Sequence, residues 1–235
     1  MKYMMVLSYD GSKFYGFQRQ KNVRNVQGYL ESVISNILEE NIVVKGAGRT
    51  DRGVHAKYQV VHFETEKNFF NLKRKLNKNL EDLKIRKIKK VNDNFHARHS
   101  VKNKTYLYKI DLSNKRDNKY YLFCKNNLDI KKMKLASKVF IGFHNFKNFV
   151  AGNRIDYTST ILNIKIYKFN NILYLKFKGI GFYRYMIRNL VGALIEVSKG
   201  KIDISVIENM LNNPSVEKRL PTSSPNGLYL IKINY

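Results

Sequence analysis

The chain has 235 residues, 43% of them hydrophobic, which is enough to bury the core of one large domain or two small ones. It carries 44 Lys and Arg against 18 Asp and Glu, a net charge of +26 that is spread from end to end. This charge is typical of proteins that bind nucleic acid, because contacts to phosphate release counterions. An AT-rich genome would also enrich lysine, so the charge alone does not decide the partner.

Several classes of protein and site are excluded or disfavoured. Cys124 is the only cysteine, so an intrachain disulfide is excluded, and we expect a reducing, cytoplasmic location. We expect no signal peptide, and no apolar run approaches the ~20 residues of a membrane span. The histidines are scattered without metal-ligand spacing, and no phosphate-cradling glycine motif occurs. We therefore expect neither a metal nor an organic cofactor.

The first half of the chain predicts six elements. Runs rich in β-branched residues or with alternating polarity predict strands at residues 2–9, 42–47, 59–65 and 85–91. Apolar residues at helical spacing predict helices at 26–38 and 68–80, the first with Asn25 as its N-cap.

The second half is similar in outline. It predicts strands at 105–112, 158–169, 172–178 and 228–234, with a tight turn at Asn170-Asn171. It predicts helices at 130–140, 182–198 and 204–212, with Asp129 and Asp203 as caps of the first and last. Residues 113–127 and 142–157 show the least pattern, and we interpret them as RNA-facing loops or as connectors without a partner.

The order β-α-β-β-α-β therefore occurs twice. It predicts an α+β fold of two ferredoxin-like halves, residues 1–98 and 99–235, joined edge to edge into one large, mainly antiparallel sheet with helices on one face.

Candidate chemistry concentrates in the stretch Gly48-Arg49-Thr50-Asp51-Arg52-Gly53-Val54-His55-Ala56. The two glycines allow positive φ or close approach of a ligand. Arg49 and Arg52 should lower the pKa of Asp51 and keep it ionised. An ionised carboxylate on a tight loop can act as a nucleophile. In isolation, such a stretch is more often a turn cap flanked by solvated arginines.

Several further motifs accompany this stretch, in one order along nearly the whole chain. They are Tyr9-Asp10-Gly11, Tyr15-Gly16-Phe17-Gln18-Arg19-Gln20, Val26-Gln27-Gly28-Tyr29-Leu30-Glu31, Phe95-His96-Ala97-Arg98, Lys104-Thr105-Tyr106-Leu107-Tyr108, Gly181-Phe182-Tyr183-Arg184-Tyr185-Met186-Ile187-Arg188-Asn189 and Pro225-Asn226-Gly227-Leu228. With them, the chain resembles the TruA-type tRNA pseudouridine synthases. The block around Asp51 is the specific one, and each of the others would be weak alone.

The resemblance implies the pseudouridine synthase fold, homodimerisation, and isomerisation of uridine to pseudouridine in RNA without a cofactor. Asp51 matches the family's essential aspartate, which either attacks C1′ to give a sugar ester or assists a route through a glycal. Because the carboxylate must reach a base inside an RNA, we expect the target nucleotide to flip out. The family default is the anticodon stem-loop of tRNA, and a structured ribosomal RNA site is the alternative.

The other candidate site residues follow from the same resemblance. Tyr106 matches an active-site tyrosine whose ring can stack on uracil. Arg188 lies in an apolar helix, where a guanidinium should have a carboxylate partner, and we expect that partner to be Asp51. The C-terminal half would thus complete the active site. We expect the remaining candidates to contact substrate phosphates: Arg49, Arg52, Arg98 and Lys104.

Some positions depart from the family pattern. Phe17 stands where tryptophan is usual, Ser223-Ser224 precede Pro225, and residues 113–127 look shortened. Because such loops help to grip tRNA in this family, the resemblance specifies the reaction more firmly than the RNA substrate. Two rival classes remain open: a non-catalytic RNA-binding protein on the same fold, and a small basic structural protein. The first would not need Asp51, Tyr106 and Arg188 together, and the second would tolerate Asp51→Asn.

Overall fold

The computed structural model describes residues 1–113, 119–124, 128–214 and 220–235. They form two units. Unit 1 comprises Met1–Lys102 and Tyr229–Tyr235, and unit 2 comprises Asn103–Leu228. The end of the chain therefore returns to the first unit.

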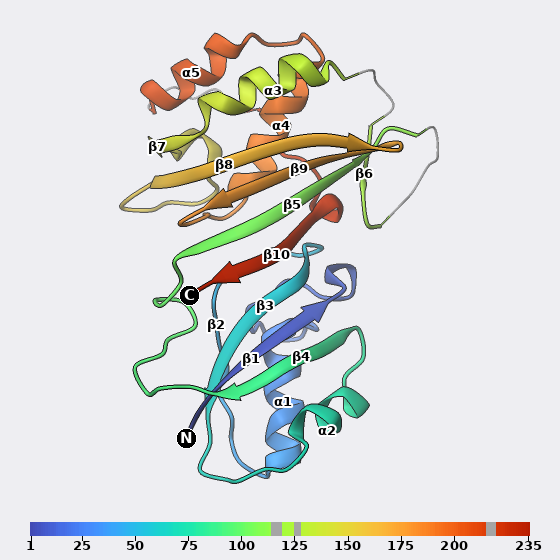
Figure 1. The fold of residues 1–235 in the computed structure, drawn as a ribbon, viewed down its shortest axis with the longest axis vertical. Coiled ribbons are helices and arrows are strands. Elements are labelled where there is room, and N and C mark those ends of the chain that lie inside the picture. Colours follow the sequence, from blue (N-terminus) through green and yellow to red (C-terminus); the bar gives the residue numbers. More distant parts are fainter. Residues whose placement is uncertain (114–118, 125–127, 215–219) are drawn as a thin grey trace. The chain divides into compact units, whose positions relative to one another are not determined.

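Unit 1 is built on a sheet in which β1 lies between β3 and β4 and is antiparallel to both, as Figure 1 shows. Short β2 is antiparallel to β3, and the last strand, β10, is parallel to β3. The elements run in the order β1 (Lys2–Tyr9), α1 (Val26–Leu38), β2 (Lys45–Gly46), β3 (His55–Glu64), α2 (Leu72–Asn79), β4 (Leu83–Lys90) and β10 (Leu228–Asn234).

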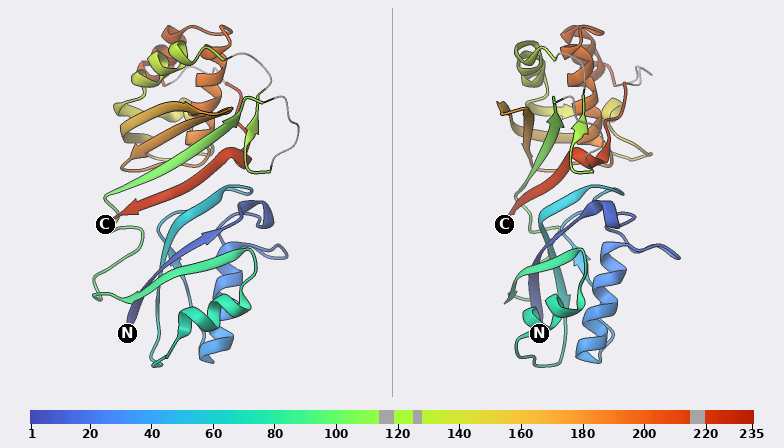
Figure 2. Two further views of the ribbon diagram at one scale, coloured as in Figure 1. Left: turned by 45° about the vertical axis from the view of Figure 1, so that its right-hand side comes forward. Right: turned by 90° about the vertical axis from the view of Figure 1, so that its right-hand side faces the viewer.

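Helix α1 lies behind this sheet (Figure 2). Its first turn is capped by Asn25, whose Oδ1 accepts the Gly28 N–H at 2.8 Å, as the sequence predicts for an N-cap. Val26, Leu30 and Ile34 recur at helical spacing and are buried. The apolar stripe of α1 therefore closes the core over the central strand β1.

Unit 2 has its own sheet, in the order β5-β9-β8-β7 with antiparallel neighbours, and with short β6 parallel to β5. Helix α3 packs against α4 and α5. The elements are β5 (Asn103–Asp111), β6 (Leu122–Phe123), α3 (Ile130–Val139), β7 (Gly142–Asn145), β8 (Thr158–Phe169), β9 (Ile172–Gly179), α4 (Met186–Ser198) and α5 (Ile204–Asn212).

The predicted fold class, α+β with mainly antiparallel strands, is confirmed. The predicted element order is also present, with β6 and β7 added in the second half. The bounds agree with prediction at residues 2–9, 26–38, 158–169, 204–212 and 228–234. No helix in the described ranges is both long and apolar enough to cross a membrane.

The helix predicted from residue 182 begins only at Met186, because Tyr185 has φ 61° and a helix does not continue through a left-handed residue. Asn71 at φ 56° likewise delays the helix predicted from residue 68 until Leu72. The strand predicted at 42–47 is paired only at Lys45–Gly46, whereas β3 starts at His55, before the predicted residue 59.

The interpretation of residues 142–157 as loop was wrong for their first half. Residues 142–145 form β7, and a 3-10 turn at Lys147–Phe149 follows. Phe146 and Phe149 are buried, which fixes this segment in the core of unit 2. In the other predicted loop, residues 113–127, positions 114–118 and 125–127 lie outside the described residues.

Candidate active site

The Asp51 loop of unit 1 runs from β2 to β3 and is held by its backbone. The Phe17 N–H donates to the Thr50 carbonyl at 3.0 Å, and the Val54 N–H donates to the Asp51 carbonyl at 3.1 Å. Gly53 has φ 81°, which lets the chain reverse directly after Asp51. Gly16 approaches so closely that a Cβ there would lie 3.0 Å from the Thr50 carbonyl oxygen. Asp51 therefore sits on a fixed, tight turn.

Two side chains, one from β1 and one from β3, hold the loop by hydrogen bonds. The Tyr9 hydroxyl and Thr50 Oγ1 are 2.8 Å apart, and Gln59 Nε2 donates to the Gly48 carbonyl at 2.9 Å. Burial raises the pKa of Tyr9 to about 12, although its hydrogen bonds to Thr50 and Gln59 act in the opposite direction. Tyr9 is thus a neutral hydrogen-bonding partner of the loop at neutral pH.

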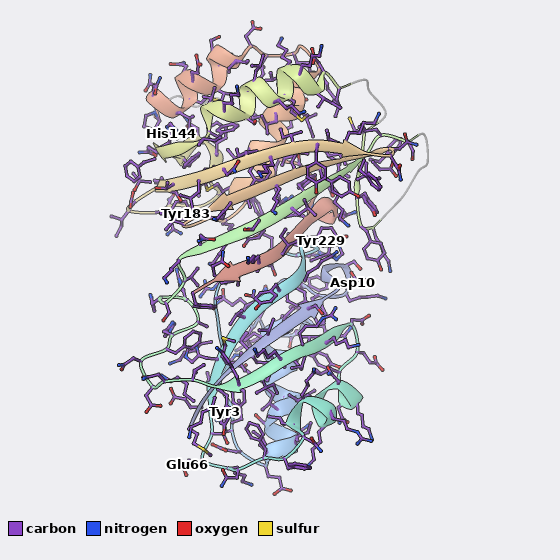
Figure 3. The ribbon with its side chains drawn as sticks, viewed as in Figure 1. Tyr3, Asp10, Glu66, His144, Tyr183 and Tyr229 are labelled. Carbon is purple, nitrogen blue, oxygen red and sulfur yellow. The ribbon has the colours of Figure 1, made fainter. Side chains whose placement is uncertain are left out.

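His55 anchors the far end of the loop. Its ring is 2% exposed and stacks on Tyr229 with centroids 4.6 Å apart (Asp10 and Tyr229 are labelled in Figure 3). His55 Nδ1 accepts the Gly11 N–H at 3.1 Å and lies 3.3 Å from Asp10 Oδ1. The backbone of Gly11 and the side chain of Asp10 therefore both hold the His55 ring at this nitrogen. His55 positions the loop rather than facing a substrate.

The two arginines beside Asp51 extend into solvent, unlike the loop's buried Thr50. The Arg52 guanidinium lies over the Tyr15 ring at 4.0 Å, a cation–π contact that orients it without neutralising it. Arg49 is exposed as well. Both remain accessible to a phosphate.

The loop that carries Arg98 is also in unit 1 and is fixed through histidines. The Ala97 N–H donates to His62 Nδ1 at 3.1 Å, and the Arg98 N–H donates to His96 Nδ1 at 3.1 Å. The Tyr235 hydroxyl donates to the Ala97 carbonyl at 2.8 Å. The backbone around Arg98 is thereby tied to β3 and to the chain end, while its side chain is exposed.

In unit 2, Tyr106 lies on β5 opposite Phe177 of β9. It is 8% exposed, and its ring meets Phe182 edge to face at 5.3 Å. Lys104, two pairs nearer the start of the strand, lies opposite Gly179 and is half-exposed.

Arg188 lies in the first turn of α4, half-buried, and two contacts set its direction. Its Nε donates to the Ser223 carbonyl at 2.7 Å, and its guanidinium lies over the Tyr185 ring at 4.5 Å. The Ser223 N–H donates back to the Arg188 carbonyl at 3.1 Å. Residues 221–224 are therefore bound along α4.

The segment after Pro221 is also fixed from β5. The Tyr108 hydroxyl donates to the Ser224 carbonyl at 2.6 Å. Burial raises the pKa of Tyr108, and the positive charge of Arg188 acts weakly against this shift. At Gly192 a Cβ would lie 1.7 Å from the Pro221 carbonyl oxygen, so only glycine permits this approach.

The sequence candidates thus fall into two sets, Asp51 with three arginines in unit 1 and Arg188 with Tyr106 and Lys104 in unit 2. A family model for tRNA pseudouridine synthases matches residues 5–100 and 136–235. The chain belongs to the tRNA pseudouridine synthase family. Asp51, Arg98 and Arg188 lie inside the matched ranges, whereas Tyr106 and Lys104 lie between them.

Curated relatives are similar over their whole length. The tRNA pseudouridine synthase A of Dictyoglomus thermophilum is 39% identical over 239 residues, 97% of each chain. That of Pseudothermotoga lettingae is 35% identical over 247 residues, covering 100% of this chain and 99% of the relative. The tRNA pseudouridine synthase A 2 of Bacillus cereus is 34% identical over 242 residues, 99% of each.

Sequence reasoning missed the residues that support the two candidate sets. Gln59 lies in a predicted strand, and Ser223 was only a departure from the family pattern. Tyr9 belongs to the quoted motif Tyr9-Asp10-Gly11, which did not reveal its contact to Thr50. The Tyr9–Thr50 and Arg188–Ser223 contacts span 41 and 35 positions, so no local pattern reveals them.

Gly192→Ala should destabilise the protein. Alanine normally stabilises a helix interior by about 1 kcal/mol relative to glycine, but here its Cβ would collide with the Pro221 carbonyl. We expect a loss of about 1–3 kcal/mol in the free energy of unfolding, measured in urea. The control is Gly181→Ala, whose Cβ would meet only Ser159 Oγ at 3.6 Å. A Gly192→Ala protein as stable as the control would disprove the close packing.

The free energy of unfolding should also decrease in acid because of the buried His62. Burial, the largest cause, and the positive charges of His96, Lys2 and Lys45 together lower the pKa of His62 to about 4. Between pH 6.5 and about 4 the unfolded chain binds a proton that the folded chain does not, so the free energy of unfolding decreases as the pH falls. The full effect is up to about 3 kcal/mol.

The measurement is urea unfolding at several pH values for wild type and His62→Gln. The variant should have a shallower slope between pH 6.5 and 4, with a remaining part from His96, whose pKa is also lowered by burial. His144→Gln, on β7 of unit 2, should leave the slope unchanged. Equal slopes for all three proteins would remove His62 from the explanation.

Proposed function

We propose that this protein isomerises uridine to pseudouridine in the anticodon stem-loop of tRNA, with Asp51 as the catalytic carboxylate. Membership of the tRNA pseudouridine synthase family supports the reaction and the RNA class. The observation that supports Asp51 is its loop: a carboxylate on a tight turn held by Phe17, Tyr9 and Gln59 and flanked by two exposed arginines. Such a loop presents an acidic group in a defined position.

The chemistry needs an ionised carboxylate at C1′ of the target nucleotide. The bond from C1′ to N1 breaks, the uracil turns, and C5 joins C1′. The C5 hydrogen leaves as a proton and N1 gains one, so the product is an isomer. Asp51 serves either by adding to C1′ as a nucleophile or by assisting loss of a sugar proton on the glycal route. Both routes require the charged form, which Arg49 and Arg52 favour.

The remaining residues have supporting roles in this proposal. Arg188 supplies a permanent positive charge to Asp51, because a guanidinium does not lose its proton, and its contacts to Ser223 and Tyr185 set its direction. Tyr106 offers its ring to the flipped uracil. The exposed or half-exposed cations Arg49, Arg52, Arg98 and Lys104 bind substrate phosphates.

Loss of the Asp51 carboxylate should abolish the reaction. We would measure release of tritium from RNA carrying 5-³H-uridine, offering tRNA and ribosomal RNA transcripts separately. Wild type should act on tRNA, and Asp51→Asn should be slower by about 10³-fold or more while still binding RNA. Asp93→Asn is the matched control, because it removes the same charge from an exposed site in unit 1.

Each other outcome has a definite meaning. Binding without release from any RNA would identify a non-catalytic RNA-binding protein. Release by Asp51→Asn at the wild-type rate would show that Asp51 is the wrong residue. Release from ribosomal RNA alone would show that ribosomal RNA, and not tRNA, is the substrate.

We also propose that the protein works in the cytoplasm as a homodimer, as the family resemblance implies. Light scattering should give twice the 27.7 kDa chain mass at micromolar concentration. A mass of one chain there would contradict the dimer.

A further inference from the structure

One face of the unit 2 sheet carries an ordered array of lysines and tyrosines. Across β5, β9 and β8, Lys109 is opposite Tyr174, which is opposite Tyr167. In the next rows Lys176 is opposite Lys165, and Lys178 is opposite Asn163. We call this surface the lysine–tyrosine face, defined by Lys109, Lys165, Lys176, Lys178, Tyr167 and Tyr174.

This face is open. Strand residues alternate in burial, so that Ile164, Ile166, Leu175 and Phe177 are buried while Lys165 and the lysines of β9 are exposed. Helix α4 lies behind these strands in Figure 1 and to one side of them in the right-hand view of Figure 2. The lysine–tyrosine face is the side turned away from α4.

The lysines that β8 and β9 place on the face have no acidic neighbour within these two strands. Neither strand contains an acidic residue, and three of their four lysines, Lys165, Lys176 and Lys178, belong to the face. Lys165 and Lys176 are directly opposite across the strands, an arrangement that costs stability because like charges repel. A bound polyanion would remove this repulsion. A second copy of the same face would increase it, which disfavours self-association here.

The tyrosines add a second feature. The rings of Tyr167 and Tyr174 are stacked, with centroids 5.1 Å apart and an interplanar angle of 12°. Tyr167 is 47% exposed, so one end of the stack is open to solvent. Lys109 Nζ lies 4.9 Å from the centre of the neighbouring Tyr121 ring. Exposed aromatic rings beside cations are typical of surfaces that stack unpaired bases and bind the adjoining phosphates.

We propose that the lysine–tyrosine face binds an unpaired segment of the RNA substrate outside the stem that carries the target uridine. Lys165, Lys176 and Lys178 contact its phosphates, and the Tyr167–Tyr174 stack receives a base. This inference rests on the proposed function, because it assigns further contacts to the same RNA. It gives the face a part in substrate affinity and none in the chemical step.

The test compares two charge-reversed proteins of equal net charge. One is Lys165→Glu/Lys176→Glu, and the control is Lys131→Glu/Lys134→Glu, which alters two exposed lysines of α3 in the same unit. Binding of an unmodified tRNA transcript is measured by filter retention at several salt concentrations. The face variant should bind about tenfold or more weakly than the control, with a log–log salt slope smaller by about two.

Three further readouts separate a binding role from misfolding. Lys176→Glu alone places a carboxylate opposite Lys165, so its Tm should equal or exceed that of wild type while its RNA affinity falls. Tyr167→Ala should weaken binding about fivefold or more without changing the salt slope. Tritium release at saturating tRNA should keep the wild-type kcat in these variants, with a raised KM.

The outcomes also distinguish this inference from the proposed function. If wild type releases tritium and the face variant binds tRNA like the α3 control, the face has no RNA role and the proposed function stands. If wild type releases none from any RNA, the proposed function fails, and the binding measurement still decides whether the face recognises RNA. A change in mass on light scattering of the face variant would identify an interface between copies and overturn the RNA proposal.

Discussion

The Asp51 turn depends on a layer of buried hydrogen bonds that contains no charge. Tyr9 and Gln59 bind the loop at Thr50 and Gly48, and Phe17 binds it through the backbone. A charged group beneath the loop would shift the pKa of the Asp51 carboxyl, downward for a cation and upward for an anion, and a neutral support does neither. The Tyr9 phenol is neutral at physiological pH, and burial, which raises its pKa to about 12, extends that neutrality into alkaline solution. The positive groups beside Asp51 instead extend into solvent.

In unit 2, contacts likewise restrict a long and flexible side chain, that of Arg188. Arginine carries about 2 kcal/mol of rotamer entropy, so a free Arg188 would be a poor positioning group. The Ser223 carbonyl, the Tyr185 ring and the helix restrict the Arg188 side chain. This restriction requires residues 221–224 to lie directly on α4, which the missing side chain of Gly192 makes possible. A departure from the family pattern, Ser223, contributes here only through its backbone.

Sequence alone predicted the regular elements where pattern and local chemistry agree. Helix α1 has an apolar stripe and an asparagine cap, and β8 and β9 alternate on both sides of a turn at Asn170, whose φ is 51°. Prediction failed where a single residue has a left-handed backbone conformation, as at Tyr185. It also failed at the short edge strand β7, which is stabilised by residues distant in sequence. At the candidate site, Asp51 was singled out from its glycines and arginines and stays a prediction, whereas the residues that hydrogen-bond its loop are distant in sequence.

Unit 1 is discontinuous, and this has a consequence for synthesis. Strand β10 pairs in parallel with β3 through Tyr229 and Leu230, and Tyr229 covers the ring of His55 at the end of the Asp51 loop. Along the sequence, all of unit 2 is inserted between the two segments that form unit 1. During translation, β3 leaves the ribosome about 165 residues before its partner, or roughly 10–30 seconds at ordinary elongation rates. The Asp51 loop therefore obtains the support of Tyr229 only after unit 2 has been synthesised, and a chain that stops before β10 carries Asp51 without that support.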